Sequence, residues 1–589
     1  MPEAIAALLC CRGLNTPQLA EDYLRPALEQ MHAPQLMLGM NTAVERLIAA
    51  LRASEPILIY GDYDVDGTVA TVLLKTALER AASALHLTAD VRYHIPHRLR
   101  EGYGIQSTRL ADAWEEGVRL VVSVDTGIRA FAAAEEARRL GLDLIVTDHH
   151  LPDSAEGVPD AVAVINPNQP GCPYPYKELC GAAVSYKLAQ AVLEATARDA
   201  EELRRLREKL LPSFLKLLAI ATIADSVPLT GENRTIASLG LAELRTPTQA
   251  GLRSLMELAS IDLNRPISSF DVGFRIAPRI NAAGRMDIAS DVVELFLTRD
   301  AALARTLAEK LHQLNEDRRA TEADALREIE IRLEQLAGQD EALAAALTLD
   351  DAGLPARWHR GVVGILASRV VDRMALPALV ITHEDNAEGN SSAHGSGRSI
   401  EGFHLLEAIT AAHDEHRQQT GHGLFHRFGG HAHAVGFSLP SENVPALRER
   451  LAAYSRQHMP AEPQTPTLEC DLELRFSELT PSFYTALEQL GPFGNSNPEP
   501  IFLTRNVRLV APLRTIKDRH LRLTVEDPTD GLRLGGMAWS RARIEFTELA
   551  REQDWQPGDA LDIAYRLRRN WHPSFGGWEM EVLALRSAS

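Results

Sequence analysis

The sequence predicts an α/β protein in which a parallel-sheet domain is joined by a long helix to a second α/β domain, followed by an all-β barrel. Three observations predict this order. Apolar runs of strand length alternate with helical patterns over residues 46–166, which is typical of a parallel sheet covered by helices on both faces. Residues 301–338 contain no proline and reach a glycine only at their end, so one long helix can connect two lobes. Past the proline-containing stretch 459–467, short strand patterns separated by turns indicate a barrel.

The expected elements follow in chain order. Residues 1–45 are helix-like and punctuated by proline, and a mostly helical region extends from the sheet to about residue 300. Buried strands are predicted at 56–60, 119–124, 142–147 and 161–166, and helices at 68–81 and 130–141. We therefore expect five parts: an N-terminal helical segment (1–45), the parallel-sheet domain (46–300), the connecting helix (301–340), the second α/β domain (341–458) and the barrel domain (463–589).

The composition is that of a globular protein. Hydrophobic residues make up 45% and charged residues 24% of the 589 residues, and this length predicts several domains. No run approaches the roughly 18 to 20 apolar residues that cross a bilayer, and the start lacks the basic region of a signal peptide. The five cysteines form no CxxC pair, which argues against a zinc ribbon or a disulfide framework. We expect a cytoplasmic protein with no membrane partner.

The net charge of −19 does not exclude a nucleic-acid partner. Binding a polyanion requires a local positive surface and not a positive total charge. Residues 501–589 carry a small surplus of Lys and Arg over Asp and Glu, while the rest of the chain is acidic. Cations and aromatic side chains that suit strand binding there are Lys517, Arg519, Arg522, Trp539, Trp571 and Phe575. An aromatic barrel core is the alternative for the Trp residues.

An acidic motif follows the first predicted strand. Asp62, Asp64 and Asp66 alternate between this strand and the next helix, which places them at the carboxyl edge of the sheet, where open α/β folds bind ligands. Three carboxylates so close together repel one another unless a cation neutralises them. A solvated acidic loop is the alternative. An EF-hand is excluded, because the loop has no Glu at its twelfth position and no flanking pair of helices.

Acidic and imidazole side chains also end other apolar runs. Asp125 follows the second predicted strand, and Asp148, His149 and His150 follow the third. One strand-terminal Asp is often a helix cap, but three strand ends that all carry Asp are better explained by a shared site. Asp225 ends a further apolar run, and the sequence leaves open whether it is a cap or an inward-facing ligand.

The set of donor atoms indicates which metal is bound. Carboxylate oxygens with one or two imidazoles suit Mn²⁺ or Mg²⁺ better than structural Zn²⁺, which prefers thiolate and imidazole. The cluster is large enough for two ions. Two ions roughly 3.5 to 4 Å apart activate water and stabilise the attacking and leaving oxygens of phosphoryl transfer. The residues therefore predict two-metal phosphodiester chemistry.

Four motifs resemble, in order, those of the DHH phosphoesterase superfamily: GDYDVDG (61–67), SVDTG (123–127), TDHH (147–150) and ADSVPL (224–229). The resemblance implies seven site residues: the metal ligands Asp64, Asp66, Asp125, His149 and Asp225, and the catalytic residues Asp62 and His150 beside the metals. These last two are either further ligands or contacts of the scissile phosphate. The superfamily's pyrophosphatases have a His where this chain has Tyr60. The chain departs here toward the exonuclease branch, and the ligand set of the first metal stays open.

Further segments are similar to the single-strand exonucleases of this superfamily: 96–104, 278–286, 314–319, 358–369, 395–400, 427–437 and 490–502. The similarity covers nearly the whole chain and implies a DHH domain, a DHHA1 domain and an oligonucleotide-binding (OB) barrel. It implies 5′-to-3′ removal of 5′-mononucleotides from single-stranded DNA, in DNA recombination and repair. It also implies a single-strand-binding protein and a DNA helicase as partners.

The candidate substrate-binding residues come from these segments. In Gly- or Pro-rich turns a guanidinium can meet phosphate through two hydrogen bonds, and glycine lets backbone amides approach an anion. The candidates are Arg98, Arg279, Asn281, Arg285, His359, Gly397, Arg398, Ser399, Gly429, Gly430 and His431. A surface ion pair is the alternative for each Arg, and we expect ordinary packing for His433.

Two other functions stay open at this point. An oligonucleotidase or phosphatase that acts on very short nucleotides has no need of a terminal barrel. A metal-free DNA-binding scaffold would have lost the carboxylates that this chain keeps. The sequence does not decide the physiological metal, the preference for DNA over RNA, or the oligomeric state.

Overall fold

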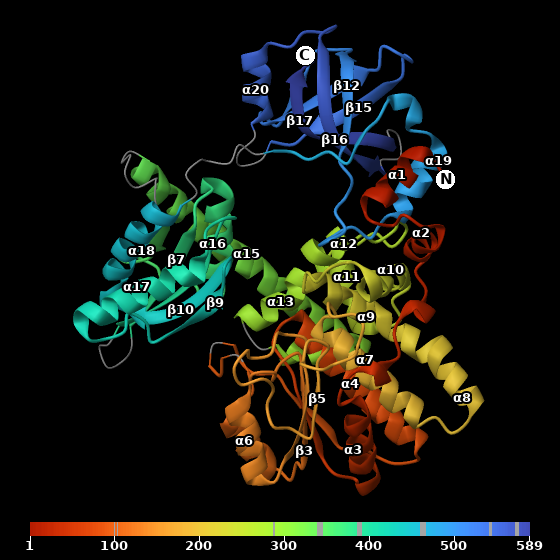
Figure 1. Cartoon of the computed structure of the whole chain (residues 1–589), viewed down its shortest axis with the longest axis vertical. Coiled ribbons are helices and arrows are strands. Elements are labelled where there is room, and N and C mark those ends of the chain that lie inside the picture. The colour runs from red at the N-terminus through yellow and green to blue at the C-terminus, as the bar shows by residue number, and fades with distance from the viewer. Residues whose placement is uncertain are drawn as a thin grey trace. The chain divides into compact units, whose positions relative to one another are not determined.

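The computed structural model describes residues 1–98, 100–102, 104–286, 289–337, 346–385, 391–459, 467–540, 545–571 and 576–588 (Figure 1). The chain forms two compact units. The first contains Met1–Asn315 and Glu478–Pro500, and the second contains Glu316–Ser477 and Ile501–Ser589. Among the described residues, no helix combines the length and the apolar character that a membrane crossing requires.

A five-stranded parallel sheet is the base of the first unit. The strands lie in the order β2-β1-β3-β4-β5, and every neighbouring pair is parallel. They are β1 (Ile57–Tyr60), β2 (Val91–His94), β3 (Leu120–Val124), β4 (Asp143–Thr147) and β5 (Ala163–Ile165). The four predicted strands are confirmed. The edge strand β2 was not predicted, because only one of its four residues is buried and it has no apolar run.

Helices cover both faces of this sheet. They are α3 (Met40–Ala53), α4 (Val65–Ala84), α5 (Ser107–Glu115), α6 (Phe131–Leu140) and α7 (Gly181–Ala195). Ile57 and Ile59 pack into the core that contains α3, α4 and α7, whereas Leu58 and Tyr60 pack into the core that contains α5 and α6. Figure 1 shows α6 on one side of the strands and α3, α4 and α7 on the other. The alternation is that of a central strand buried on both faces, and the predicted α/β class is confirmed.

The strand order places the candidate site. β1 lies between β2 and β3, so the chain goes from β1 to one neighbour and then crosses to the other side. In open parallel sheets the crevice at such a reversal, at the carboxyl ends of the strands, is the usual ligand site. The predicted acidic residues follow β1, β3 and β4, so the topology brings them to one edge.

A helical layer completes the core of the first unit. It contains α8 (Ala200–Arg205), α9 (Leu211–Ala224), α10 (Gly231–Glu243), α11 (Ala250–Leu258), α12 (Ser269–Asp271), α13 (Ala277–Met286) and α14 (Ser290–Leu297). Helix α9 is almost completely buried from Phe214 to Thr222, as expected for a helix that is apolar on all sides. Its C-terminal residue is followed directly by Asp225, which therefore emerges from the core.

Two segments far apart in the sequence join this unit. α1 (Glu3–Cys11) contacts α19 (Pro481–Gln489), and Tyr23 of α2 (Pro17–Leu24) donates to the Leu490 carbonyl at 2.9 Å. Arg234 of α10 also donates to the Leu490 carbonyl, at 3.0 Å, and to that of Gly491 at 2.8 Å. Residues 478–500 therefore pack with the first unit, although the sequence analysis grouped them with the barrel.

α15 (Ala301–Ala337) is a single helix of 37 residues, which corresponds to about 55 Å at 1.5 Å per residue. Ala308 and Leu311, in its N-terminal part, are buried in the core of the first unit. Its later residues Ala325, Ile329 and Leu333 are buried in the core of the second. The predicted connecting helix is confirmed over these residues, and 338–340 lie outside the described residues.

A second, mixed sheet lies in the second unit, in the order β6-β7-β8-β10-β9. Its strands are β6 (Leu347–Asp350), β7 (Ala378–Asp385), β8 (Ser391–Arg398), β9 (Arg427–His431) and β10 (Ala434–Pro440). One face packs against α16 (Val363–Met374) and α15. The other packs against α17 (Leu405–Thr420) and α18 (Val444–His458). This is the predicted second α/β part.

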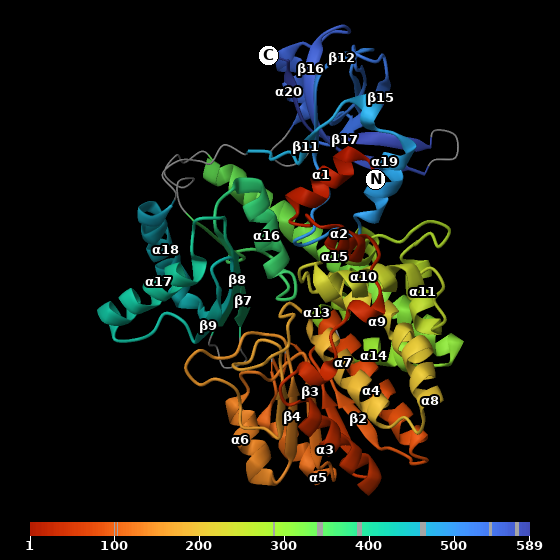
Figure 2. The ribbon, with the colours of Figure 1, turned by 45° about the vertical axis from the view of Figure 1, so that its right-hand side comes forward.

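The C-terminal strands form one seven-stranded sheet, drawn in blue in Figure 2. They are β11 (Leu472–Glu473), β12 (Phe502–Leu509), β13 (Arg514–Ile516), β14 (His520–Glu526), β15 (Arg533–Ala538), β16 (Ala560–Asn570) and β17 (Gly577–Ser587), with α20 (Phe546–Gln553) between β15 and β16. β12 pairs with β16, β16 with β17, β17 with β15, β15 with β14, and β14 with β12. Five strands therefore form the closed arrangement of an OB barrel.

Candidate metal centre

Helix N-termini hold the acidic motif after β1. Asp64 caps α4, since its Oδ1 accepts from the N–H of Gly67 at 2.9 Å. The Asp66 carboxylate accepts from the first N–H groups of α7, those of Gly181 at 2.6 Å and Ala182 at 2.9 Å. A helix N-terminus offers unpaired N–H groups and the positive end of the helix dipole, both of which stabilise an ionised carboxylate. The fold thus fixes these two acids before any ligand binds.

Asp125 has a left-handed backbone, with φ of 58°. Residues other than glycine seldom adopt this conformation, and it is concentrated at functional sites. The Asp125 N–H donates to the Thr147 carbonyl at 3.0 Å, which ties the end of β3 to the end of β4. The side chain is buried, with the residue 2% exposed.

His149 lies at the centre of the cluster. Its Nε2 atom is 3.4 Å from Asp125 Oδ1, 3.8 Å from Asp225 Oδ2 and 3.9 Å from Asp66 Oδ2. The two longer separations are beyond hydrogen-bond length. Among the described residues, His149 Nε2, Asp125 Oδ1, Asp225 Oδ2 and Asp62 Oδ1 are buried without a hydrogen-bond partner. Buried polar atoms are nearly always paired, so these converging orphaned atoms indicate a cation site.

The donors form overlapping groups of three whose atoms lie within 4.8 Å of one another. The groups are Asp66 with His149 and Asp225, Asp62 with Asp64 and Asp125, and Asp125 with His149 and His150. Asp125 is shared by two of them. Oxygen donors with one or two imidazoles fit Mn²⁺ or Mg²⁺, so the residues present fit two such ions.

Electrostatics also favour a cation at this position. Burial, and then the charge of a neighbouring Asp, raises the pKa of Asp62 and of Asp225 to about 8. Burial and the charge of Asp66 raise the pKa of Asp125 well above its ordinary value. Several of these carboxyl groups cannot be ionised together at neutral pH unless a positive charge compensates them.

Asp148 lies behind the cluster and holds His150. Its carboxylate accepts from the N–H groups of Ile128 at 2.9 Å and His149 at 2.7 Å, and lies 2.7 Å from His150 Nδ1. Burial by itself lowers the pKa of His150, but this carboxylate outweighs burial, and the pKa rises to about 9. The Asp148 carboxylate therefore favours the protonated form of His150. The sequence analysis placed Asp148 at the shared site but did not predict that it orients His150.

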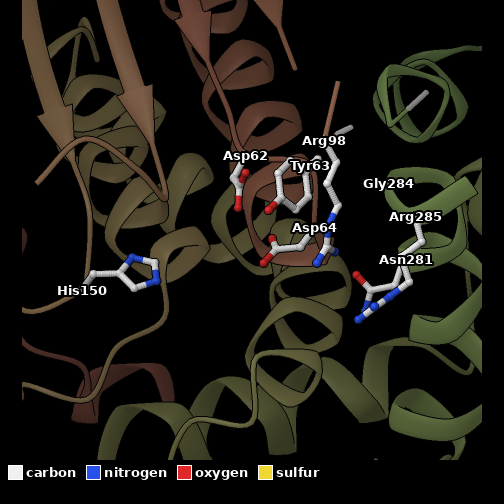
Figure 3. Close-up of a pocket in the computed structure, with 8 residues that line it drawn as sticks. All are labelled: Asp62, Tyr63, Asp64, Arg98, His150, Asn281, Gly284 and Arg285. Atoms are coloured by element: carbon white, nitrogen blue, oxygen red, sulfur yellow. The ribbon is translucent and has the colours of Figure 1, made fainter. Parts of the chain in front are cut away.

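A pocket of about 310 Å³ adjoins the acidic loop. It is lined by Asp62, Tyr63, Asp64, Arg98, His150, Asn281, Gly284 and Arg285. Figure 3 shows Asn281 and Arg285 on the α13 side, and His150 across the pocket from them. The Arg98 guanidinium lies 5.0 Å from the centre of the Tyr63 ring, a contact that the sequence analysis missed. The guanidinium groups line this pocket together with the carboxylates of the metal site. This arrangement suits a phosphate group that is bound by a guanidinium on one side and by a metal on the other.

Arg279 is not brought to this pocket. Its Nε donates to His312 Nδ1 at 3.1 Å, and its Nη1 donates to the Arg275 carbonyl at 2.5 Å. Residues two apart on a helix point in nearly opposite directions. Asn281 lines the pocket, so Arg279 faces away from it. The motif alone did not reveal which face of α13 is turned to the site.

Arg398 lies in the second unit beside the first turn of α16. Its Nη1 donates to Ser396 Oγ at 3.0 Å and to the Gly397 carbonyl at 2.7 Å. A Cβ atom on Gly364 would lie 3.4 Å from Arg398 Nη2 and 3.2 Å from Ser396 Oγ, so the helix N-terminus and the guanidinium are close neighbours. Burial lowers the pKa of Arg398. The guanidinium and the positive end of the helix dipole lie beside each other, and together they favour the binding of an anion.

The other predicted residues of this unit are distributed around β8 to β10. Ser399 Oγ donates to the Phe403 carbonyl at 2.7 Å, and His359 Nδ1 accepts from the Gly361 N–H at 3.0 Å. Gly429, Gly430 and His431 are exposed on β9. His433 is also exposed, in the turn between β9 and β10, where its ring lies beside that of His431.

The basic and aromatic side chains of the barrel lie at its surface. Lys517, Arg519 and Arg522 are exposed, and Trp539 and Trp571 are 44% and 45% exposed. The alternative of an aromatic barrel core does not hold for these two Trp residues. Phe575 lies outside the described residues.

This fold and this cluster define a DHH phosphoesterase. The model of the DHH family, N-terminal domain, matches residues 56–222, that of the DHHA1 domain matches 341–457, and that of the RecJ OB domain matches 470–576. The three matches follow the first sheet, the second sheet and the barrel in order.

Comparison with individual proteins shows which family of DHH phosphoesterases the chain belongs to. The chain is 37% identical over 571 residues to the single-stranded-DNA-specific exonuclease RecJ of Dickeya dadantii, with 94% of each chain covered. It is 36% identical over 533 residues to the protein of the same name from Bacillus subtilis, covering 90% of this chain and 62% of that relative. The chain belongs to the RecJ family.

Solved structures agree with this assignment. RecJ from Thermus thermophilus in complex with Mn²⁺ matches all of this chain and 76% of its own, with a TM-score of 0.76 and 29% identity. The Mg²⁺ complex of RecJ from the same source has a TM-score of 0.71 and 28% identity, and 75% of that chain is covered.

Proposed function

We propose that this protein is a 5′-to-3′ exonuclease that releases 5′-mononucleotides from single-stranded DNA by metal-dependent phosphodiester hydrolysis. One observation carries the proposal: orphaned buried oxygen and nitrogen atoms converge beside a pocket lined by guanidinium groups, in a chain of the RecJ family. A two-metal centre and a phosphate pocket are what hydrolysis of a phosphodiester requires.

We assign the metal ligands from the groups of donor atoms. Asp66, His149 and Asp225 would hold one ion, and Asp64 and Asp125 the other, with Asp125 shared and Asp62 as an adjacent oxygen donor. Bound there, the ions would supply Lewis acidity and water activated at neutral pH. The Asp66 carboxylate is oriented by the α7 N-terminus, so the protein keeps part of the site in place.

The remaining pocket residues bind and orient the substrate. Arg98 and Arg285 meet the phosphate next to the scissile bond, and Asn281 offers an amide to the same nucleotide. His150, held as an imidazolium by Asp148, donates a hydrogen bond to a non-bridging phosphate oxygen. Its positive charge opposes the negative charge that grows on these oxygens during hydrolysis.

The second unit supplies recognition of the strand end and of the strand. Arg398, Ser396 and the first turn of α16 form the binding site for the 5′-terminal phosphate, with Gly397, Ser399 and His359 beside it and Gly429, Gly430 and His431 along the strand. The exposed cations and Trp residues of the barrel bind nucleotides further along by charge and stacking. A place in DNA recombination and repair, in the cytoplasm and beside a single-strand-binding protein and a helicase, is part of the proposal on family resemblance alone.

Digestion of end-labelled strands tests the proposal. Single strands labelled at the 5′ or the 3′ end are incubated with the protein and Mn²⁺, Mg²⁺ or EDTA. We expect the 5′ label to appear at once as a mononucleotide, the 3′ label to be released last, and EDTA to stop both. Early release of the 3′ label would overturn the polarity, and hydrolysis in EDTA would overturn the metal assignment.

A further inference from the structure

The turn that follows Asp225 has an unusual backbone. Ser226 is left-handed, with φ of 59°. It directly follows Asp225, which caps the C-terminus of α9 and points Oδ2 into the metal cluster. Serine does not favour this conformation, and it persists only where surrounding contacts hold it. The position of the Asp225 carboxylate therefore depends on whatever fixes this turn.

A loop from the far end of the chain bridges this turn. The side-chain Nδ2 of Asn495 donates to the Ser226 carbonyl at 2.7 Å. The Leu229 N–H donates to the Asn495 carbonyl at 2.8 Å. One residue thus holds both ends of the four-residue turn, and all of these residues belong to the first unit.

The bridging loop is itself anchored. Asn497, which is 3% exposed, donates through Nδ2 to the carbonyls of Leu490 at 3.1 Å and Pro492 at 2.8 Å. Its Oδ1 lies 2.8 Å from the Tyr23 hydroxyl oxygen. The Gly494 N–H donates to the Asn497 carbonyl at 2.9 Å. Asn495 is therefore presented by a cross-linked loop and can act as a fixed support.

Close packing adds to these hydrogen bonds. A Cβ atom on Gly494 would lie 2.6 Å from Cδ1 of Leu229, a distance that real Cβ contacts do not reach. Leu229 is 2% exposed and has little room to move. A side chain at residue 494 would therefore displace the Leu229 side chain at the end of the Asp225 turn.

The other side of the turn has contacts of its own. The Pro228 carbonyl accepts from Asn233 Nδ2 at 3.0 Å and from the Tyr176 hydroxyl at 3.3 Å. These contacts remain when Asn495 is changed, so the turn stays formed while the support at Ser226 is lost. Loss of the Asn495 side chain therefore removes the hydrogen bond to Ser226 and leaves these contacts available to the turn.

We propose that Asn495 is a positioning residue of the metal centre. By bridging Ser226 and Leu229 it holds the left-handed turn that presents Asp225 beside His149 and Asp66. By this inference, the segment 478–500, which leads into the barrel, helps to position a metal ligand of the first unit. The catalytic consequence rests on the proposed function, whereas the effect on metal binding does not.

The test measures Mn²⁺ binding to full-length protein without DNA, by electron paramagnetic resonance of free Mn²⁺. Thermal melting of the same samples is measured in parallel. Asn495→Ala removes the Ser226 hydrogen bond, and we expect Mn²⁺ at the site that Asp225 serves to bind about three- to tenfold less tightly, as one lost hydrogen bond implies. Gly494→Val, which forces Leu229 to move, should weaken it at least as much. Turnover of both variants should recover at high Mn²⁺.

Thr485→Ala is the matched control, because it removes one exposed hydrogen bond, to the Pro481 carbonyl at 3.0 Å, in the same segment but away from the turn. It should bind Mn²⁺ as the wild type does. Wild-type Mn²⁺ affinity in both Asn495→Ala and Gly494→Val would overturn the inference, as would equal weakening in the control. If Mn²⁺ binding weakens as expected but the wild type digests no DNA, the inference stands and the proposed function fails.

Discussion

Nε2 of His149 lies 3.4 Å from Oδ1 of Asp125, and neither atom has a hydrogen-bond partner among the described residues. Both atoms are buried in the first unit. His149 belongs to a group of donors with Asp225, and Asp125 belongs to another with Asp62. Two polar atoms so close and yet unpaired are explained by a cation between the strand ends of β3 and β4.

Asp125→Ala removes the carboxylate that two groups of donors share. We expect hydrolysis to fall by more than about 100-fold, because a shared ligand matters more than the outer partners whose loss costs 10- to 100-fold. The fold should persist, since Oδ1 of this carboxylate has no hydrogen-bond partner among the described residues. Single-turnover digestion in Mn²⁺ with circular dichroism measures both, and turnover at the wild-type rate would remove the two-metal assignment.

The raised carboxyl pKa values predict a pH-dependent stability of the metal-free protein. In EDTA, Asp62 and Asp225 have pKa values of about 8 in the folded state, against about 4 when unfolded. The unfolded state loses these protons first, so stability falls as pH rises from about 4 through 8. Saturating Mn²⁺ should abolish this fall and raise the melting temperature. Melting curves at pH 6 and pH 8 test this prediction. Equal melting temperatures at the two pH values in EDTA would contradict the raised pKa values of Asp62 and Asp225.

Asp148→Asn tests how His150 is held. The variant keeps the shape of the side chain but loses the charge that outweighs burial in setting the pKa of His150. We expect that pKa to fall from about 9 toward or below its ordinary value, and activity at pH 8 to fall by about 10- to 100-fold. Activity should recover in part at lower pH, where the imidazole is protonated again. A pH–rate profile with the wild-type shape would mean that the charge on His150 is not used.

The acidic motifs could be predicted from sequence because each follows its own strand directly. Strand ends in a parallel sheet meet at one edge, so local pattern was sufficient for Asp64, Asp125 and His149. Arg279 could not be placed, because its direction depends on which face of α13 packs inward. The docking of residues 478–500 on Arg234 was also hidden, since it depends on backbone carbonyls, which every residue carries.

Arg514 and Arg522 form a cross-strand pair between β13 and β14, and both are exposed. Like charges directly opposite one another are unfavourable in a sheet, which a bound polyanion would relieve. Arg514→Ala with Arg522→Ala should weaken binding to long single strands and reduce the slope of log K against log salt by about 1.4, at about 0.7 per phosphate contact. Trinucleotide digestion should change little.

Arg533→Ala is the control on the same barrel, because Arg533 is already paired with Glu526 at 2.7 Å. It should leave both affinity and salt slope near the wild-type values. A double variant that bound long strands like the wild type at every salt concentration would count against a binding role for this face of the barrel.

Arg398 provides the sharpest test of polarity. A terminal 5′-phosphate carries more negative charge than an internal phosphodiester, so a site that binds it marks the 5′ end of the strand. Arg398 is held by Ser396 beside the first turn of α16, where guanidinium and helix N-terminus together favour a dianionic phosphate over a hydroxyl. Arg398→Ala should therefore lower kcat/KM by about 10- to 100-fold on strands with a 5′-phosphate, the worth of a charged hydrogen bond. Strands that begin with a 5′-hydroxyl should lose much less.

The comparison uses matched 5′-phosphate and 5′-hydroxyl strands, with Mn²⁺ binding measured on the same samples. Arg456→Ala, which changes an exposed Arg of α18, controls for loss of charge alone and should leave both substrates unaffected. Metal affinity should be unchanged in Arg398→Ala, because the ligands lie in the other unit. An equal loss on both strands would move Arg398 from end recognition to general backbone contact, and the preference for the 5′ end would then have to reside in the pocket lined by Arg98 and Arg285.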